Sequence, residues 1–357
     1  PGEEHKETIA SASLAAAAGG VTSMAALPNT EPVVDDVAGV EFVARRAREV
    51  KLVKVYTYGA VTRGLAGKEI TEIGLLTDFG AVGFTDGVRA VADAQVMGRA
   101  LAYARTFGQL IVQHPEEPAL ADGVMNAGEL ATRLGLAGSP AAAEVIMLER
   151  DLRLVELTGG SYHAAHLSTA ESVEVIRRAK SRGLPVTCDT APHYFILNEN
   201  AVGDYRTFAK VSPPLRREED RQAIAEAVAD GTIDAIASDH SPHDQDSKRL
   251  PFAMADYGIV GLESLLPLSL ELAHKGKASL LEILRRLTVT PATILGLEAG
   301  RLRKGGPADF FLFDPDKPRR LDPDRFRSKS KNSPFENHPV QGELLRTIVD
   351  GRTIFQA

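Results

Sequence analysis

Three β-rich runs of this sequence each end on a residue type that binds metal ions or transfers protons. Leu110–His114 ends on a histidine, Tyr162–His166 ends on another, and Ile233–Asp239 ends on an aspartate that His240 and His243 follow. Imidazole and carboxylate groups are the ligands of zinc-type sites that keep one position open for water. A single histidine in a strand is most often structural, but three strand ends carrying ligand-type side chains predict a metal site.

A regular alternation of short β-rich runs and longer amphipathic stretches surrounds these residues. Such an alternation predicts parallel strands joined by crossover helices. The β-rich runs are Val21–Ala26, Val53–Tyr58, Ala81–Thr85, Leu110–His114, Tyr162–His166, Val186–Thr190 and Ile233–Asp239. The predicted helices between them are Val37–Val50, Ala92–Phe107, Ala170–Arg182 and Glu218–Asp230. His163 lies three residues before His166, so we expect its side chain to face the opposite side of the strand and to serve packing.

The predicted fold class is α/β: residues 1–300 form a TIM-type (β/α)8 barrel, in which functional side chains stand at the C-terminal ends of the strands. Seven runs are found where a closed barrel needs about eight strands, so we expect the first strand to be missing from this chain. An open doubly wound sheet is the alternative. It is disfavoured because Gly19-Gly20 precedes a strand, whereas a dinucleotide-binding glycine motif follows one.

After about residue 300 the alternation of β-rich and helical stretches gives way to β-rich runs alone. The runs Phe310–Phe313, Arg346–Val349 and Thr353–Phe355 are β-rich, and the Asp350-Gly351 pair between the last two is a strong hairpin signal. Residues 301–357 are therefore predicted to form the C-terminal part of a small β-sandwich-like domain beside the barrel.

Composition narrows the functional classes. The formal net charge is −7 and charges of both signs are interspersed, which argues against a nucleic-acid partner. The single cysteine, Cys188, cannot form an intramolecular disulfide and predicts a reducing, cytoplasmic environment. Neither an apolar run of about 18 residues nor a signal-peptide pattern is found, so we expect no membrane partner. A small-molecule substrate remains.

Several short blocks resemble the signature motifs of dihydroorotases, a family of metal-dependent amidohydrolases. Asp239-His240-Ser241-Pro242-His243 resembles their D-H-x-P-H, and His166-Leu167-Ser168-Thr169 resembles their H-[VIL]-S-T. The remaining blocks are Leu27-Pro28-Asn29-Thr30 (M-P-N-T), Pro213-Pro214-Leu215-Arg216 (N-P-P-L-R), Ser328–Phe335 (S-K-x-K-N-T-P-F) and Pro1–Thr8, which is similar to the stretch after H-x-H-x-R-E. Together these blocks extend the resemblance from the first residue to the last.

The resemblance implies a function and a set of roles. Dihydroorotases interconvert L-dihydroorotate and N-carbamoyl-L-aspartate in pyrimidine synthesis, using one or two zinc ions. His114 and His166 are implied as metal ligands, and Asp239 as a metal ligand that is also the general base and acid. The implied substrate-binding residues are Asn29, His243, Tyr257 and Gly258.

Four departures from the family pattern bear on these roles. The H-x-H pair is not in this chain, and the second aspartate of T-D-D-G, a metal ligand in the family, aligns with Gly87. Asp86 could substitute as a ligand only doubtfully, because a one-residue slip in a strand turns a side chain to the other face. Ser212 replaces the asparagine of N-P-P-L-R, and His193-Tyr194 replaces a His-His pair.

These departures leave two other readings open. One is a non-catalytic pseudo-dihydroorotase that acts as a scaffold for aspartate carbamoyltransferase. The other is a cyclic amidohydrolase of the hydantoinase or allantoinase type, which the Asn29 and Pro-Pro-Leu-Arg blocks disfavour. The retention of His114, His166, Asp239 and His243 favours the enzyme, and a homodimer is expected.

Overall fold

The central element of the computed structural model, which describes residues 2–357, is a curled parallel sheet. Its strand order is β1-β2-β3-β4-β7-β8-β9, and every neighbouring pair is parallel. The strands are β1 (Ser23–Ala26), β2 (Lys54–Gly59), β3 (Ala81–Phe84), β4 (Leu110–Gln113), β7 (Ser161–Ala164), β8 (Val186–Thr190) and β9 (Ala235–Ile236). All seven predicted runs are therefore strands, and their predicted parallel arrangement is confirmed.

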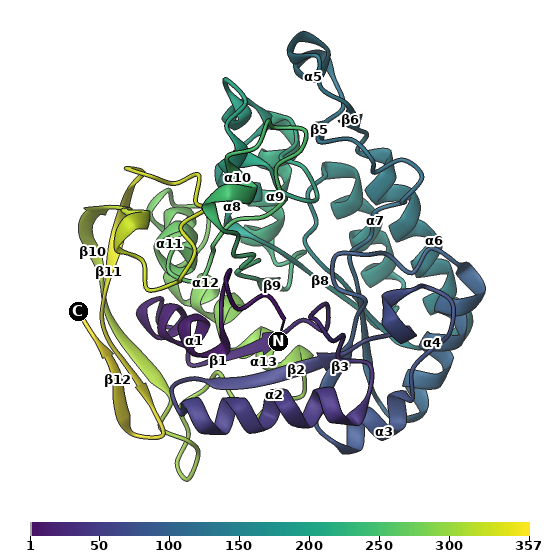
Figure 1. Ribbon diagram of the computed structural model, residues 1–357, viewed down its shortest axis with the longest axis horizontal. Helices are drawn as coiled ribbons and strands as arrows, with labels where there is room; N and C mark the ends of the chain where they lie inside the picture. Colours follow the sequence, from purple (N-terminus) through teal and green to yellow (C-terminus); the bar gives the residue numbers. More distant parts are fainter. Residues whose placement is uncertain (1) are drawn as a thin grey trace.

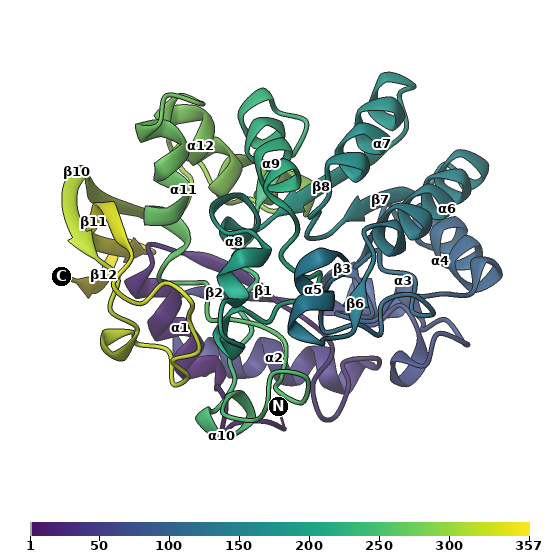
Figure 2. The ribbon, with the colours of Figure 1, turned by 90° about the horizontal axis from the view of Figure 1, so that it is seen from above.

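Helices cover the outer face of this sheet, and the curled sheet and its helices together form a half-barrel (Figures 1 and 2). The predicted helices are confirmed as α2 (Val37–Val50), α4 (Ala94–Thr106), α7 (Ala170–Ser181) and α9 (Glu218–Asp230). The others are α1 (Ile9–Ala18), α3 (Ile73–Asp78), α5 (Glu129–Leu134), α6 (Ala142–Thr158), α8 (Pro192–Ile196), α10 (Gln245–Lys248), α11 (Leu265–His274), α12 (Leu280–Leu287) and α13 (Val289–Ile294). Among residues 2–357, no helix has the length and apolarity needed to cross a membrane.

The two edge strands of the half-barrel, β1 and β9, do not pair with each other within residues 2–357. Between them lies a largely apolar cavity of about 490 Å³, lined by residues of both strands and by α12, α13 and Phe310 to Phe313. The sheet thus has the seven strands counted in the sequence and is open along this seam.

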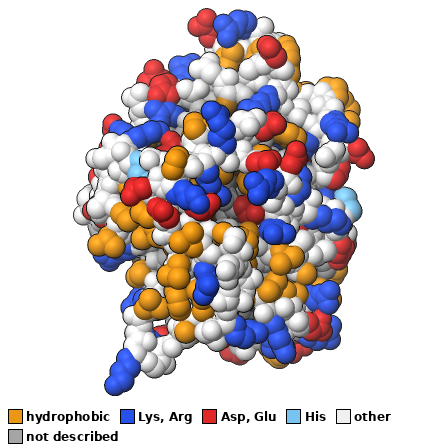
Figure 3. Space-filling model, turned by 90° about the vertical axis from the view of Figure 1, so that its left-hand side faces the viewer, with side chains coloured by type: hydrophobic (Ala, Val, Ile, Leu, Met, Phe, Trp, Pro, Cys, Tyr) orange, Lys and Arg blue, Asp and Glu red, His pale blue; other side chains and the backbone are white. Residues whose placement is uncertain are grey.

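A second, antiparallel sheet forms the C-terminal part of the chain. It has the order β10 (Phe310–Arg320), β11 (Pro339–Val349), β12 (Arg352–Gln356), and the predicted turn at Asp350-Gly351 joins the last two strands with positive φ at both residues. The sheet packs beside α1, where the Thr347 hydroxyl donates to the carbonyl of Ala17 at 2.7 Å. Figure 3 views this side of the molecule and shows hydrophobic side chains gathered on it; Leu312 and Leu345 are exposed on the sheet itself. The boundary near residue 300 and the sandwich-like character of 301–357 stay predictions.

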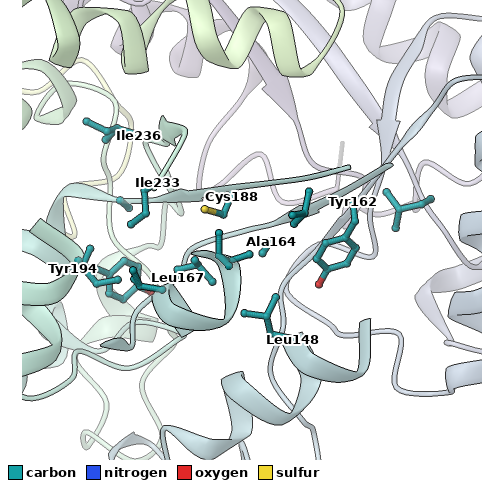
Figure 4. Packing of buried hydrophobic residues seen from close by; sticks show 14 of the residues in the cluster. Leu148, Tyr162, Ala164, Leu167, Cys188, Tyr194, Ile233 and Ile236 are labelled. Atoms are coloured by element: carbon teal, nitrogen blue, oxygen red, sulfur yellow. The ribbon is translucent and has the colours of Figure 1, made fainter. Parts of the chain in front are cut away.

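The core lies between the half-barrel and its helices, where β7 and β8 contribute Tyr162, Ala164 and Cys188 (Figure 4). Cys188 is fully buried, and burial raises the pKa of its thiol far above the usual range. This cysteine is a core residue and not a nucleophile.

Candidate active site

Asp239 lies three residues after the end of β9, at a left-handed backbone position with φ 42°. Its two carboxylate oxygens face two histidines: Oδ1 lies 3.7 Å from Nε2 of His166, and Oδ2 lies 3.4 Å from Nε2 of His193. Burial alone would raise the pKa of Asp239, but the positive charge of His166 and the nearby imidazole of His193 lower it to about 2. Asp239 is therefore a partly buried carboxylate that its two histidine neighbours hold ionised.

His166 lies two residues after the end of β7, and its backbone has a positive φ of 59°. Asp189 of β8 fixes this position, because its Oδ1 accepts from the His166 backbone N–H at 2.7 Å and lies 3.0 Å from Nδ1 of the ring. Burial opposes protonation of His166, but Asp239 and Asp189 raise its pKa to about 9. A carboxylate on one ring nitrogen, with the other nitrogen left facing the site, is the arrangement typical of metal-binding histidines.

His163 also contacts Asp189, which corrects the expectation that it faces away from His166. Its Nε2 lies 2.9 Å from Asp189 Oδ2, and its Nδ1 lies 2.7 Å from the hydroxyl of Thr187. The period-2 argument fails because β7 ends at Ala164 and the backbone at His166 is left-handed rather than extended. His163, Asp189 and His166 therefore form one hydrogen-bonded row inside the half-barrel.

His114 stands at the end of β4, with its ring centroid 6.3 Å from that of His166. Its Nε2 lies 3.0 Å from Oε2 of Glu116, which also accepts from the Ser212 hydroxyl at 2.9 Å. Burial opposes ionisation of Glu116, but the hydrogen bond and charge of His114 and the charge of Arg216 lower its pKa. Glu116 thus orients His114 in the way that Asp189 orients His166. Because Glu116 contacts Nε2, it leaves Nδ1 of His114 available.

A buried carboxylate holds the Ser168-Thr169 part of the His166 motif. Glu144 of α6 accepts from the backbone N–H groups of Ser168 and Thr169 at 3.2 Å and from both hydroxyls. Arg216 donates to Ser168 Oγ at 3.1 Å, so the Pro-Pro-Leu-Arg block reaches the same place. The two sequence motifs are parts of one network that fixes the segment after β7.

Asp86, the candidate ligand next to Gly87, forms its hydrogen bonds with Thr62. Its Oδ1 accepts from the Thr62 backbone N–H at 2.9 Å and its Oδ2 from the Thr62 hydroxyl. Burial raises the pKa of this carboxyl, although the Thr62 hydrogen bonds oppose the shift. Gly87, the next residue, has φ 68°, and a Cβ added there would lie 2.9 Å from Cγ of Asn29. The exposed side chain of Asn29 therefore lies against Gly87, where a side chain at position 87 would otherwise be.

His243, Tyr257 and Gly258, expected to bind substrate, lie side by side. Nδ1 of His243 is 3.0 Å from the carboxylate of Asp256, and burial lowers the pKa of the imidazole. The backbone N–H of Gly258 donates to the Lys210 carbonyl at 2.9 Å, and its carbonyl accepts from two side chains. Both peptide groups of Gly258 are thus already in use.

The side chains of the site include groups that bind divalent metals, but they are not spaced to hold a metal ion. His114, His166, His193 and Asp239 offer imidazole and carboxylate donors, and Nε2 of His193 is buried with no hydrogen-bond partner among the described residues. Yet no group of three or more His, Cys, Asp or Glu side chains within residues 2–357 is spaced to hold a metal ion. Of the expected ligands, His166 and Asp239 approach to 3.7 Å, and the ring centroid of His114 lies 6.3 Å from that of His166.

The sequence analysis does not single out Glu116, Glu144 and Asp189, and it names His193 only in a departure from the family pattern. Asp189 and His193 could have been found, since both lie at the end of the predicted strand Val186–Thr190 or just after it. Glu144 carries no local signal, because it lies inside a helix and meets its partners only in the fold.

Comparison with known proteins identifies the family and the fold of the chain. The family model of dihydro-orotase-like proteins matches residues 1–172, and that of the amidohydrolase family matches residues 158–355. The L-hydantoinase (dihydropyrimidinase) of Arthrobacter aurescens superposes with a TM-score of 0.87 at 26% identity, covering 99% of this chain and 81% of that one. The dihydropyrimidinase of Brevibacillus agri, at 22% identity and a TM-score of 0.84 over 98% and 80%, shows the same fold. The fold and site define an amidohydrolase.

Curated relatives narrow the family further. The dihydroorotase of Desulforapulum autotrophicum is 47% identical over 357 residues, which are 100% of this chain and 84% of the relative. The dihydroorotase of Geotalea daltonii is 46% identical over 355 residues, covering 99% and 84%. The chain belongs to the dihydroorotase family.

Proposed function

We propose that this protein catalyses the reversible opening of the cyclic amide of L-dihydroorotate to N-carbamoyl-L-aspartate, as a step of pyrimidine synthesis in the cytoplasm. The single observation that carries the proposal is Asp239, a partly buried carboxylate between His166 and His193, in a chain of the dihydroorotase family. An ionised carboxylate in the site is the group that hydrolysis of an amide needs for moving a proton.

Asp239 acts as general base and then as general acid. It takes a proton from the attacking water and delivers it to the ring nitrogen that leaves as the amide bond breaks. The buried His193 lies 3.4 Å from Oδ2, and in this proposal it orients the carboxylate so that Oδ1 serves the proton transfer. His166 faces Oδ1, and its charge favours the ionised form of Asp239 that the first proton transfer requires.

Zinc is the cofactor of this proposal, as one ion or two. His114, His166 and Asp239 would hold it, with the Asp86 carboxylate engaged by Thr62. A bound divalent ion polarises an amide carbonyl and lowers the pKa of water toward neutrality. Glu116 and Asp189 fix the imidazoles of His114 and His166, so that the nitrogens opposite these carboxylates are the ones presented to an ion.

Substrate binding is assigned to the mouth of the half-barrel. The free amide of Asn29 and the imidazole of His243 suit the non-reacting carboxylate of dihydroorotate. Of the Tyr257-Gly258 pair, Tyr257 is the residue whose backbone groups suit the ring, because those of Gly258 are hydrogen-bonded within the protein. A homodimer belongs to the proposal, and light scattering of the purified protein measures it.

The test is ring opening of L-dihydroorotate, followed by ultraviolet absorbance with zinc supplied. Asp239→Asn removes the proton acceptor while keeping the size of the side chain, and it should lower kcat by about 10²- to 10⁴-fold. Asp230→Asn, an exposed aspartate at the end of α9, is the matched control and should retain wild-type turnover. If wild type and Asp239→Asn open the ring at the same background rate, the proposed enzymatic activity is refuted. Co-purification with aspartate carbamoyltransferase then tests the scaffold reading.

Asn29→Ala should act chiefly on KM, because Asn29 is assigned to a carboxylate that does not react. Elemental analysis of protein purified without chelator measures the metal content separately from activity. Protein without bound metal, inactive at every zinc concentration, would contradict the cofactor assignment.

A further inference from the structure

Two lysines are buried beside the mouth of the half-barrel without forming an ion pair. Lys210 and Lys248 are 2% and 1% exposed. Within residues 2–357, neither ammonium group has a carboxylate oxygen within 4.0 Å. Burying a lysine is costly unless its three N–H donors are satisfied, and two neighbouring ammonium groups repel each other as well. The position of both lysines therefore needs a specific cause.

The acceptors of both lysines are backbone carbonyls of one short loop, residues 253–258. Lys210 Nζ donates to Ala253 O at 3.0 Å and to Ala255 O at 2.6 Å. Lys248 Nζ donates to Asp256 O at 2.7 Å and to Gly258 O at 3.1 Å. Four carbonyls of six consecutive residues thus converge on the Nζ atoms of two lysines.

The aromatic ring of Tyr257 completes the surroundings of Lys210. Its centroid lies 4.2 Å from Lys210 Nζ, within the range of a cation–π contact. The Gly258 N–H donates to the Lys210 carbonyl, so that both the side chain and the backbone of Lys210 hold the loop. Tyr257 is consequently fixed between the lysine at its ring and the carbonyls on either side of it.

The loop faces the proposed active site. The Asp256 carboxylate lies 3.0 Å from His243 Nδ1, and the isolated bridge between His240 and Ile259 ties the end of the loop to the segment that begins at Asp239. A Cβ added to Gly258 would lie 3.4 Å from His243 Nε2. Displacing the loop would therefore displace the partner of His243 and the backbone of Tyr257.

We propose that Lys210 and Lys248 are positioning residues that bind the carbonyls of residues 253–258 and so hold His243 and Tyr257 in the geometry that receives the substrate. The kinetic part of this inference rests on the proposed function, whereas the positioning itself does not. The lysines contact neither Asp239 nor the histidines around it, so they act on substrate binding through the loop.

The test replaces each lysine by methionine, which fills similar volume without charge or donors. Hydrogen exchange by mass spectrometry measures the loop in the full chain without reference to activity. In Lys248→Met and Lys210→Met, the amides of residues 253–258 should exchange at least about tenfold faster, because each variant loses two hydrogen bonds to the carbonyls of the loop. Lys275→Met, at an exposed residue of the α11 terminus that pairs with Glu271, is the control and should leave the loop unchanged.

Kinetics supply the second readout. With L-dihydroorotate, KM should rise about tenfold in each methionine variant while kcat stays within about threefold of wild type. Equal loss in kcat and unchanged KM, or unchanged exchange in the loop, would overturn the proposal. Lys248→Gln keeps one donor group and serves where Lys248→Met does not fold. If neither variant folds, the lysines are needed for the whole fold and the proposed local role is wrong.

The two readouts separate the two proposals. Faster loop exchange in a protein that has no dihydroorotase activity would support the positioning of the loop and refute the proposed function. Full activity with normal KM in both methionine variants would support the function and refute the positioning.

Discussion

Glu144→Gln tests the network that positions His166. The carboxylate of Glu144 is fully buried on α6 and accepts four hydrogen bonds, from the backbone N–H and hydroxyl groups of Ser168 and Thr169. Glutamine has nearly the same shape but offers a single oxygen. Its amide N–H groups would point at donors that the second carboxylate oxygen now accepts.

The magnitude follows from these hydrogen bonds. About two of the four lose their acceptor, and a hydrogen bond to a charged group is worth about 1.5–3 kcal/mol. Rotation of the two hydroxyl groups recovers part of the loss. We therefore expect Glu144→Gln to lower the free energy of unfolding by about 3–5 kcal/mol, in line with removal of one partner from a buried charged network.

Urea unfolding measures this change, as a shift of the midpoint at constant m-value. Glu149→Gln is the matched control, because Glu149 lies on the same helix with its side chain 58% exposed and should change stability by less than about 0.5 kcal/mol. If Glu144→Gln is as stable as Glu149→Gln, the carboxylate does not hold the segment after β7. The assignment of Ser168 and Thr169 as its donors would then be wrong.

Three further predictions concern other parts of the site. Burial raises the pKa of the Glu263 carboxyl to about 7, although two backbone N–H groups oppose the shift. The protonated form therefore contributes to the free energy of unfolding below pH about 4.5, and this contribution is lost as the pH rises through about 7. Glu263→Gln should remove this pH-dependent loss of stability, which urea unfolding measures. Gly258→Ala should cost at least about 2 kcal/mol more than Gly276→Ala in the same assay, because φ is +118° and the added Cβ would lie 2.4 Å from Ser241 Oγ, whereas nothing lies within 4 Å at Gly276. Arg216→Lys should lose about 2–3 kcal/mol of unfolding free energy, since one ammonium cannot reproduce the several directions in which the buried guanidinium donates.

The barrel could be predicted from the sequence because its signals are local. Each strand is a short β-rich run bounded by amphipathic helical sequence, and two helices, Val37–Val50 and Glu218–Asp230, have the predicted bounds. The Asp350-Gly351 turn is equally predictable, since both residues have the positive φ that this pair favours. Strand lengths were less predictable: Ile233–Asp239 was expected as a strand, but only Ala235–Ile236 pairs with β8.

The site could be predicted only where its residues lie at strand ends. His114, His166 and Asp239 follow the ends of β4, β7 and β9, and their roles stay predictions, whereas the sequence does not predict the carboxylates that orient the two histidines. Glu144 approaches Ser168 across 24 positions of the chain, and such a contact leaves no period or spacing to detect. His163 shows the converse error, since a periodic rule was extended past the end of the strand to which it applies.

The C-terminal motif Ser328–Phe335 illustrates how a segment outside the barrel can belong to its site. Asn332 is buried, accepts from the His243 backbone N–H at 3.0 Å, and donates to the carbonyls of Ser241 and Gly258 at 2.9 and 3.1 Å. One amide therefore links the segment after Asp239 to the loop that Lys248 holds. A boundary near residue 300 divides the chain by its secondary structure, but it does not divide the site. The asparagine of this motif is explained by its three hydrogen bonds, since no other side chain of that size both donates twice and accepts.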